Sequence, residues 1–398
     1  MASDQKILYF LSHPIQYFSP LLRQLAGRAD LEVYYFSDAS ITGKMDKGFG
    51  QAVQWDQPLL EGYPSQFLPN YSRRVSMNNQ FLDVFNPGVA GVIARKKPAV
   101  VIVNGWTYSS TLMAIFFGRL FGAQVWLRAE NPLNQELGKK GYLLFLKKLF
   151  LKNILFRFFV SRCLYIGQES RLFFEYYGVP PARLVYTPYA VDNHFFSGEA
   201  ERLKGDRPGL LRKLGLPADK KVILFSGKYI PKKRPLDLIR AFEGLTPGLY
   251  QLVMVGEGAL RGEMERYIAD KGLQGVTLTG FINQSMIPSY YAAADVFVMC
   301  SGAGETWGLS VNEAMNFQKP VLVSKTCGCS VDLVKEGENG FVFEQGDIAA
   351  LTGYLKRVLE DDAFRLSAGK RSGEIIKDFS IDRIVDNIIT ALPQNSRI

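Results

Sequence analysis

The sequence has few cysteines and histidines, the residues that stabilise small folds through disulfides and metal sites. Four cysteines are spread over 398 residues, and Cys327 and Cys329 flank a single glycine, which is too close for ordinary disulfide geometry. Two histidines, His13 and His194, leave a zinc site short of its usual ligands. No run of about 18 apolar residues is free of charge, and residues 1–10 lack the basic and apolar regions of a secretory leader. These absences exclude a disulfide scaffold, and they predict a cytoplasmic protein without a transmembrane helix or a metal site.

The composition is that of an ordinary globular protein, with 47% apolar and 21% charged residues. A chain of 398 residues predicts two domains. The net charge of +9 comes mainly from residues 1–200. The basic residues there are interspersed with large apolar ones and form no motif that reads nucleic acid, so we expect no nucleic-acid partner.

Short apolar runs alternate with helix-length segments along the whole chain. This pattern predicts helices between strands, such as those at 20–28, 110–121 and 236–242. The predicted strands are 6–11, 32–36, 99–104, 125–128, 163–166, 221–226, 251–256, 276–279, 296–300 and 321–324. Such alternation is typical of α/β domains with doubly wound parallel sheets. The charged, weakly periodic segment 193–207 is the predicted linker. In these folds ligands bind at the carboxyl ends of the strands.

A basic turn follows the first predicted strand of the second domain. Residues 227–235 contain Lys228, Lys232, Lys233 and Arg234 just before a predicted helix. Cations in this place can clamp a diphosphate, and each charge-assisted hydrogen bond contributes about 1.5–3 kcal/mol. The alternative is a solvated basic turn without a ligand.

A second loop, SGAGETWGLSVNEAMN at 301–316, leads from a predicted strand into a helix that begins near Leu309. Gly308 permits close backbone approach, and the N-terminus of the helix favours an anion. Glu305 and Glu313 suit sugar and ribose hydroxyls, because a carboxylate accepts two hydrogen bonds in fixed geometry. The alternative is a helix with exposed glutamates.

The stretch GETWGLSVNEAM resembles the E-x7-E signature of retaining family 4 glycosyltransferases, which have the GT-B fold. Five further segments resemble the family in its order: HPIQYFSPLL, PYAVDNHFF, SGKYIPKKRPLDLI, VGEGALRGEME and GCSVDLVKEGENGFVFEQGD. The resemblance covers nearly the whole chain and is looser in the first half. It implies two Rossmann-like domains facing across a cleft: an acceptor domain at 1–192, onto which a C-terminal helix near 380–398 packs back, and a nucleotide-sugar donor domain at 193–379.

The resemblance also implies roles for individual residues. Glu305, Lys233 and Lys228 are the expected catalytic residues, with Lys228 at the place of the family's usual arginine and Arg234 at that of its usual glycine. The expected donor-binding residues are Glu313, which would hold the ribose, together with Thr306, Trp307, Gly308, Leu309, Ser310, Gly280 and Phe281.

The first domain departs further from the family. Residues 12–16 replace a glycine-rich loop, and Arg128–Ala129–Glu130–Asn131 stands where many relatives have a histidine. We infer that His13, Gln16, Arg128 and Glu130 reach donor or acceptor. For His13 the alternative is a structural hydrogen bond at a helix cap.

The implied reaction moves a sugar from a UDP- or GDP-sugar to an acceptor, with retention of anomeric configuration and no metal or other cofactor. The expected acceptor is a lipid-linked glycan or a glycan of the envelope or an exopolysaccharide. Two alternatives keep the fold: a catalytically degenerate scaffold at a membrane surface, and a GT-B phosphorylase or epimerase. An NAD enzyme is disfavoured, because no G-x-G-x-x-G follows the first strand.

The segment 139–162 holds seven Lys and Arg, no Asp or Glu, and fourteen large apolar residues. This pattern indicates a basic amphipathic helix on the inner face of a membrane. The expected contacts are Lys139, Lys140, Tyr142, Phe145, Lys147, Lys148, Lys152 and Phe156, with Phe159 as a further anchor. The alternative is a domain helix whose apolar side packs on the sheet.

Overall fold

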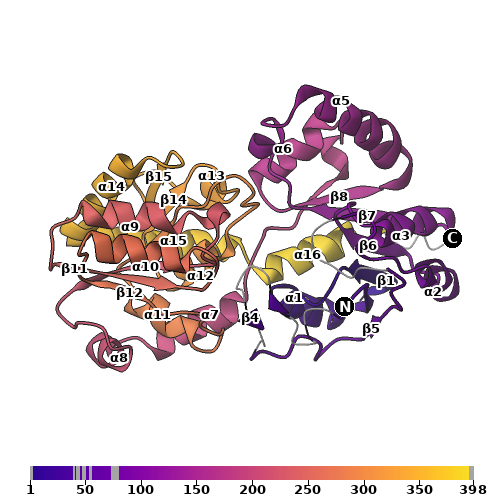
Figure 1. The fold of residues 1–398 in the computed structure, drawn as a ribbon. Coiled ribbons are helices and arrows are strands. Elements are labelled where there is room, and N and C mark those ends of the chain that lie inside the picture. Colours follow the sequence, from indigo (N-terminus) through magenta and orange to yellow (C-terminus); the bar gives the residue numbers. More distant parts are fainter. Residues whose placement is uncertain are drawn as a thin grey trace. The chain divides into compact units, whose positions relative to one another are not determined.

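The computed structural model describes residues 3–38, 41, 45–46, 51–52, 56–72 and 80–393. The chain forms two compact units. The first comprises Met1–Lys44, Pro58–Tyr189 and Ile381–Ile398, and the second comprises Met45–Gln57 and Ala190–Ser380. The C-terminal helix α16 (Ile381–Ala391) therefore belongs to the first unit, where it packs against α1 (Phe18–Ala26), as the yellow and indigo helices of Figure 1 show. The sequence did not predict that residues from 45–57 belong with the second unit.

The first unit is built on a seven-stranded parallel sheet of order β5-β2-β1-β6-β7-β8-β9. Its strands are β1 (Ser3–Leu11), β2 (Ala29–Tyr35), β5 (Ser65–Phe67), β6 (Val100–Asn104), β7 (Gln124–Ala129), β8 (Arg162–Tyr165) and β9 (Leu184–Tyr186). A short antiparallel pair, β3 (Met45–Asp46) and β4 (Gln51–Ala52), lies outside this sheet and belongs to the second unit. The helices of this unit besides α1 and α16 are α2 (Gly88–Lys96), α3 (Ser109–Leu120), α4 (Leu133–Glu136), α5 (Gly141–Phe150), the π-helix η1 (Leu151–Phe159), α6 (Gln168–Tyr176) and the short η2 (Pro181–Arg183).

The second unit is built on a six-stranded parallel sheet of order β12-β11-β10-β13-β14-β15. Its strands are β10 (Lys221–Ser226), β11 (Tyr250–Val255), β12 (Val276–Leu278), β13 (Val296–Met299), β14 (Val321–Ser324) and β15 (Gly340–Phe343). Its helices are α7 (Asn193–Arg202), α8 (Arg207–Lys213), η3 (Pro231–Lys233), α9 (Pro235–Glu243), α10 (Arg261–Asp270), α11 (Ile287–Ala293), α12 (Leu309–Asn316), α13 (Ser330–Leu333), α14 (Ile348–Glu360), α15 (Asp362–Ile375) and η4 (Ile376–Asp378).

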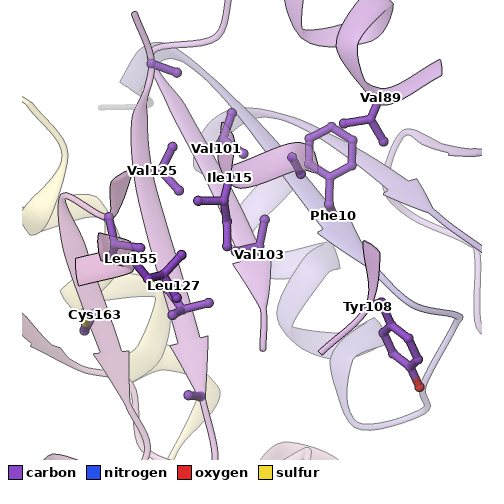
Figure 2. Close-up of a cluster of buried hydrophobic side chains, with 14 of the residues drawn as sticks. Phe10, Val89, Val101, Val103, Tyr108, Ile115, Val125, Leu127, Leu155 and Cys163 are labelled. Carbon is purple, nitrogen blue, oxygen red and sulfur yellow. The ribbon is translucent and has the colours of Figure 1, made fainter. Parts of the chain in front are cut away.

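The core of the first unit explains why its apolar runs become parallel strands. Val101, Val103, Val125 and Leu127 on neighbouring strands are fully buried, and Ile115 of α3 covers them (Figure 2). β-branched side chains suit such a pleated surface, and burial on both faces requires continuous rather than alternating apolar runs. The ten strands predicted from the sequence are all present, within a few residues; the short strands β3, β4, β5, β9 and β15 were not predicted.

The predicted linker at 193–207 is wrong. Residues Asn193–Arg202 form helix α7, whose N-terminus is capped by the side chain of Asp192 accepting a hydrogen bond from Phe195 N at 3.0 Å. Phe196 is fully buried and meets the rings of Tyr291 and Phe317 edge-on. The cap and the buried Phe196 both hold this helix, whose exposed face is charged.

Candidate functional site

The second sheet has a topological switch point between β10 and β13. From β10 the chain proceeds to β11 on one side, and it later returns to β13 on the other side. Loops that leave the carboxyl ends of two such strands diverge and leave room for a ligand. The loops here are 227–234 and 300–308, which carry the basic turn and the first of the two predicted glutamates. The predicted donor-side residues are therefore brought to one edge of one sheet.

The ion pair between Lys233 and Glu305 joins these two loops. Lys233 Nζ lies 2.5 Å from Glu305 Oε2, and Lys232 Nζ lies 4.0 Å from the same oxygen. Burial by itself raises the pKa of Glu305, but the charges of the two lysines outweigh it and hold the pKa below its usual value. Glu305 is thus an ionised carboxylate with a side chain only 9% exposed, beside two cations that can also meet a phosphate.

Arg234 occupies the place of the family's usual glycine, and its backbone keeps the conformation that glycine favours. Its φ is 49°, in the left-handed region, which costs a non-glycine residue about 1 kcal/mol. The guanidinium Nε donates to Asp237 Oδ2 at 2.5 Å in the first turn of α9. Arg234 therefore has a backbone conformation that glycine favours and carries a cation that is tied to α9.

The loop from Glu305 to Gly308 is held by backbone contacts with the turn after β14. Gly328 N donates to Glu305 O at 3.2 Å, and Cys329 N donates to Trp307 O at 3.2 Å. A Cβ on Gly328 would lie 1.9 Å from Thr306 O, so the approach requires glycine there. Gly308 has a φ of 107°, and α12 begins at the next residue, Leu309, followed by Ser310.

Trp307 has a structural side chain. It is 2% exposed, and its indole Nε1 donates to Asn312 Oδ1 at 2.8 Å. If Trp307 contacts a donor, the contact is therefore made by its backbone.

Glu313 lies one turn into α12 and is buried. Tyr291 of α11 donates its hydroxyl proton to Glu313 Oε2 at 2.6 Å. Burial raises the pKa of Glu313 to about 7, while the hydrogen bond from Tyr291 and the charge of Lys233 oppose this rise. This carboxyl group titrates near neutral pH, in contrast to Glu305, whose pKa is held low.

Two further loops complete this edge of the sheet. Gly256 N donates to Gly280 O at 3.0 Å, and a Cβ on Gly256 would lie 1.9 Å from Gly227 O. Gly280 and Phe281, which follow β12, thus lie beside the turn after β11. That turn packs on the loop after β10, which contains the half-buried Lys228.

The first sheet has its own switch point between β1 and β6. His13 and Gln16 follow β1, and Asn104 ends β6, where its Oδ1 accepts a hydrogen bond from Tyr9 at 2.9 Å. His13 Nδ1 lies 3.0 Å from Ser12 Oγ, and the N-cap residue of α1 is Tyr17. Gln16 Oε1 is buried without a hydrogen-bond partner among the described residues.

Arg128 is enclosed rather than exposed to a ligand. Its side chain is 4% exposed, its Nη1 lies 2.5 Å from Glu130 Oε1, and its guanidinium lies over the rings of Phe18 and Tyr189 at 4.9 and 4.7 Å. Of the predicted pair, Arg128 is buried and Glu130, at 31% exposed, is the more accessible member; contact of either residue with donor or acceptor stays a prediction.

The basic apolar segment is two helices, α5 and the π-helix η1. In α5 no residue is buried, and Tyr142 and Phe145 are 62% and 68% exposed. Lys140, Lys148 and Lys152 are also exposed. Lys139 is half-exposed at 47% and bonds Glu136 Oε2 at 2.7 Å. No helix in the described residues is long and apolar enough to cross a membrane.

Two predicted membrane contacts in this segment are wrong. Phe156 of η1 is 2% exposed, because it packs edge-on against Phe174. Lys147 turns inward: its Nζ lies 2.6 Å from Oε1 of the buried Glu136 and over the rings of Trp106, Phe173 and Tyr177. Phe159 is partly buried against the core.

Sequence reasoning missed several polar residues at these edges. Tyr291 lies in an apolar helix before β13, and Asn104 ends an apolar strand. Gln345 follows β15 and accepts a hydrogen bond from Ala303 N at 3.2 Å. The position of Asn104 at a strand end was the one signal that could have identified it.

Residues 206–392 match the family model of glycosyl transferases group 1. The lipopolysaccharide core biosynthesis glycosyltransferase LpsE of Rhizobium meliloti is 29% identical over 199 residues, which are 50% of this chain and 56% of that protein. The UDP-Gal:alpha-D-GlcNAc-diphosphoundecaprenol alpha-1,3-galactosyltransferase of Escherichia coli is 30% identical over 233 residues, with 57% of this chain and 58% of that protein covered. The chain thus spans little more than half the length of these relatives.

Solved structures match over nearly the whole chain. Anabaena Alr3699/HepE in complex with UDP has a TM-score of 0.72 at 20% identity, covering 97% of this chain and 99% of that one. A glycosyltransferase from Rickettsia africae has a TM-score of 0.74 at 14% identity, covering 99% and 100%. The fold is therefore α/β of the GT-B type, as expected from the sequence, and residues 206–392 are similar to group 1 glycosyl transferases.

Proposed function

We propose that this protein is a nucleotide-sugar glycosyltransferase that moves a sugar from a UDP- or GDP-sugar to a glycan acceptor with retention of configuration. The observation that carries the proposal is the Lys233–Glu305 pair at the β10/β13 switch point, next to the N-terminus of α12. Cations, a helix N-terminus and hydroxyl-binding carboxylates are the groups that a sugar diphosphate requires.

The proposed mechanism is electrostatic. As the sugar leaves, negative charge grows on the diphosphate, and Lys233, Lys228 and the N–H groups at the start of α12 stabilise it. Glu305 accepts hydrogen bonds from donor sugar hydroxyls, and Glu313 holds the ribose. The departing phosphate oxygen takes the acceptor proton on the same face of the sugar, which retains the configuration. The lysines supply the counter-charge, so the proposed reaction needs no metal ion.

The comparisons support the donor class. The Anabaena protein was crystallised with UDP and with UDP-glucose, and the Escherichia coli relative carries UDP-Gal in its name. Both use the same base, so we place UDP before GDP.

The test is calorimetric titration of UDP and then GDP in EDTA, followed by analysis of the product anomer by NMR. We expect one nucleotide to bind with micromolar to low-millimolar affinity without metal, and the product to have the configuration of the donor. Binding that appears only with Mg²⁺, or an inverted product, contradicts the mechanism. Failure of both nucleotides to bind favours the catalytically degenerate scaffold.

We also propose that the protein works at the inner face of a membrane, on a lipid-linked acceptor. Helix α5 supports this proposal because it exposes apolar side chains and turns a charged one inward, opposite to an ordinary surface helix. The cation of Lys147 points into the protein, while Tyr142, Phe145 and Leu146 are 62%, 68% and 57% exposed. Large exposed apolar groups with a basic surround suit an anionic bilayer surface.

The exposed apolar residues continue onto the neighbouring helices. Phe158 of η1 is 58% exposed, and its carbonyl accepts a hydrogen bond from Arg119 Nε of α3 at 3.2 Å. Leu120 and Phe121, at the end of α3, are 60% and 46% exposed. The sequence has no acidic residue from 137 to 168, so nothing in this segment repels anionic lipid.

Co-sedimentation with vesicles that contain anionic lipid tests this proposal at low salt. We expect binding that falls when Phe145 is changed to Ser. The matched control is Leu366→Ser, because Leu366 is 70% exposed on α15 of the second unit. Equal binding of both variants, or none by the wild type, overturns the membrane proposal without touching the donor site.

A further inference from the structure

Glu313 depends on a residue outside the expected site. Tyr291 is fully buried in α11, where its ring stacks on Phe317 at 5.7 Å and meets Phe196 edge-on. Its hydroxyl donates to Glu313 Oε2 at 2.6 Å. The ring is thus fixed on several sides, and the hydroxyl has a set direction.

We propose that Tyr291 is a positioning residue of the donor site, which orients the Glu313 carboxylate and keeps it charged for a nucleotide ribose. The inference rests on the proposed function and extends it to a residue that binds no ligand itself. A carboxylate that accepts a hydrogen bond from a fixed phenol on one oxygen presents the other oxygen in a defined direction, which matters when two adjacent hydroxyls must be met.

The surroundings of Glu313 show why a donor is needed there. The carboxyl group is buried in an apolar setting that favours its neutral form and raises its pKa to about 7. Two groups oppose this effect: the hydroxyl of Tyr291 and the positive charge of Lys233. Removal of the hydroxyl therefore leaves more of the site protonated at neutral pH, and a neutral carboxyl group is the weaker acceptor for ribose.

Other elements that pack on α12 also carry charged groups. On α7, Glu199 pairs with Arg202 at 2.5 Å, and on α15, Arg371 pairs with Glu374 at 3.1 Å. His194 also lies near the start of α7. A test must separate the effect of Glu313 on the pH dependence of binding from any effect of His194.

The experiment is calorimetric titration of UDP, or of GDP if GDP is the nucleotide that binds, at several pH values between 6 and 8.5. For Tyr291→Phe we expect affinity about 3- to 10-fold below wild type at pH 7, recovering to within about twofold at pH 8.5. The matched control is Tyr290→Phe, because the neighbouring Tyr290 is partly buried but makes no side-chain hydrogen bond to any described residue. We expect it to bind as wild type at every pH.

Glu313→Gln isolates the titration. In this variant we expect the pH dependence to disappear, even though His194 remains, and the added Tyr291→Phe change to cost no more than Glu313→Gln alone. A loss in Tyr291→Phe that is the same at every pH, or that adds fully to that of Glu313→Gln, assigns Tyr291 a packing role and overturns the inference.

A second measurement does not need a nucleotide. Infrared titration of the protonated carboxyl band that is missing in Glu313→Gln should show a higher midpoint in Tyr291→Phe than in wild type. An unchanged midpoint overturns the inference. Failure of wild type to bind UDP or GDP while the infrared shift is present overturns the proposed function instead, so the two failures are distinguishable.

Discussion

Lys233 Nζ and Glu305 Oε2 lie 2.5 Å apart, and this contact links the loops that follow two adjacent strands of the second sheet. The two residues come from different segments of the sequence. For each segment taken alone, the sequence left an alternative without a ligand: a solvated basic turn for Lys233 and an exposed glutamate for Glu305. Their ion pair, with side chains only 16% and 9% exposed, shows that Lys233 and Glu305 themselves are not solvated side chains.

The first prediction concerns Lys233. Lys233→Ala should lower kcat by about 10²–10³-fold and affect nucleotide affinity less, because the leaving charge grows in the transition state. Steady-state kinetics and UDP titration measure the two effects. The control is Lys232→Ala, since Lys232 is 40% exposed and lies 4.0 Å from Glu305. Equal losses in the two variants contradict the assignment of Lys233.

The second prediction concerns Glu313 as a binding group. Glu313→Ala should weaken nucleotide affinity by about 1–3 kcal/mol, because ribose hydroxyls lose their buried partner. Calorimetry measures the change, with Glu344→Ala as control, since Glu344 makes an exposed pair with Lys325. An unchanged affinity in Glu313→Ala would falsify the ribose assignment.

The third prediction is a pH dependence of stability. The pKa of Glu313 rises from 4.5 to about 7 on folding, so its contribution to the free energy of unfolding is full below pH 4.5 and is lost as the pH rises through 7. The loss should be about 3 kcal/mol at 1.36 kcal/mol per pKa unit. Urea unfolding at pH 5 and pH 8 should show this difference in wild type relative to Glu313→Gln. Parallel curves for the two proteins mean that Glu313 does not titrate as described.

The fourth prediction concerns the inward lysine of α5. Lys147→Met should destabilise the first unit by about 1–3 kcal/mol, because Glu136, which is buried, loses one of its two cationic partners. Faster amide hydrogen exchange in α5 should accompany the loss. Lys148→Met is the control, since Lys148 is exposed on the same helix. If α5 exchanges equally in both variants, Lys147 does not anchor it.

The fifth prediction concerns the glycine under the signature loop. Gly328→Ala should shift the loop and reduce nucleotide binding, since its Cβ would meet Thr306 O at 1.9 Å. Gly353→Ala in α14 has open space and should stabilise the protein by about 0.5–1 kcal/mol. Thermal unfolding and UDP titration of both variants check this contrast. Normal binding by Gly328→Ala shows that the loop can adapt.

The sequence alone determined the parallel sheets, because apolar runs in strand–helix alternation have few other ways to be buried. It also determined the edge at which the predicted donor-side residues gather, because the carboxyl ends of parallel strands share an edge. Both results depend on local order along the chain.

Only the tertiary structure decided on which side of a helix each polar residue lies and which side chains it contacts. Lys147 and Phe156 read as membrane contacts, yet the buried carboxylate of Glu136 draws the lysine inward and Phe174 covers the phenylalanine. Tyr291 had no signal at all, since its hydroxyl matters only through Glu313. Burial and pairing depend on segments far apart in sequence, and for that reason the pKa of Glu313 and the reversed orientation of α5 could not be predicted from the sequence.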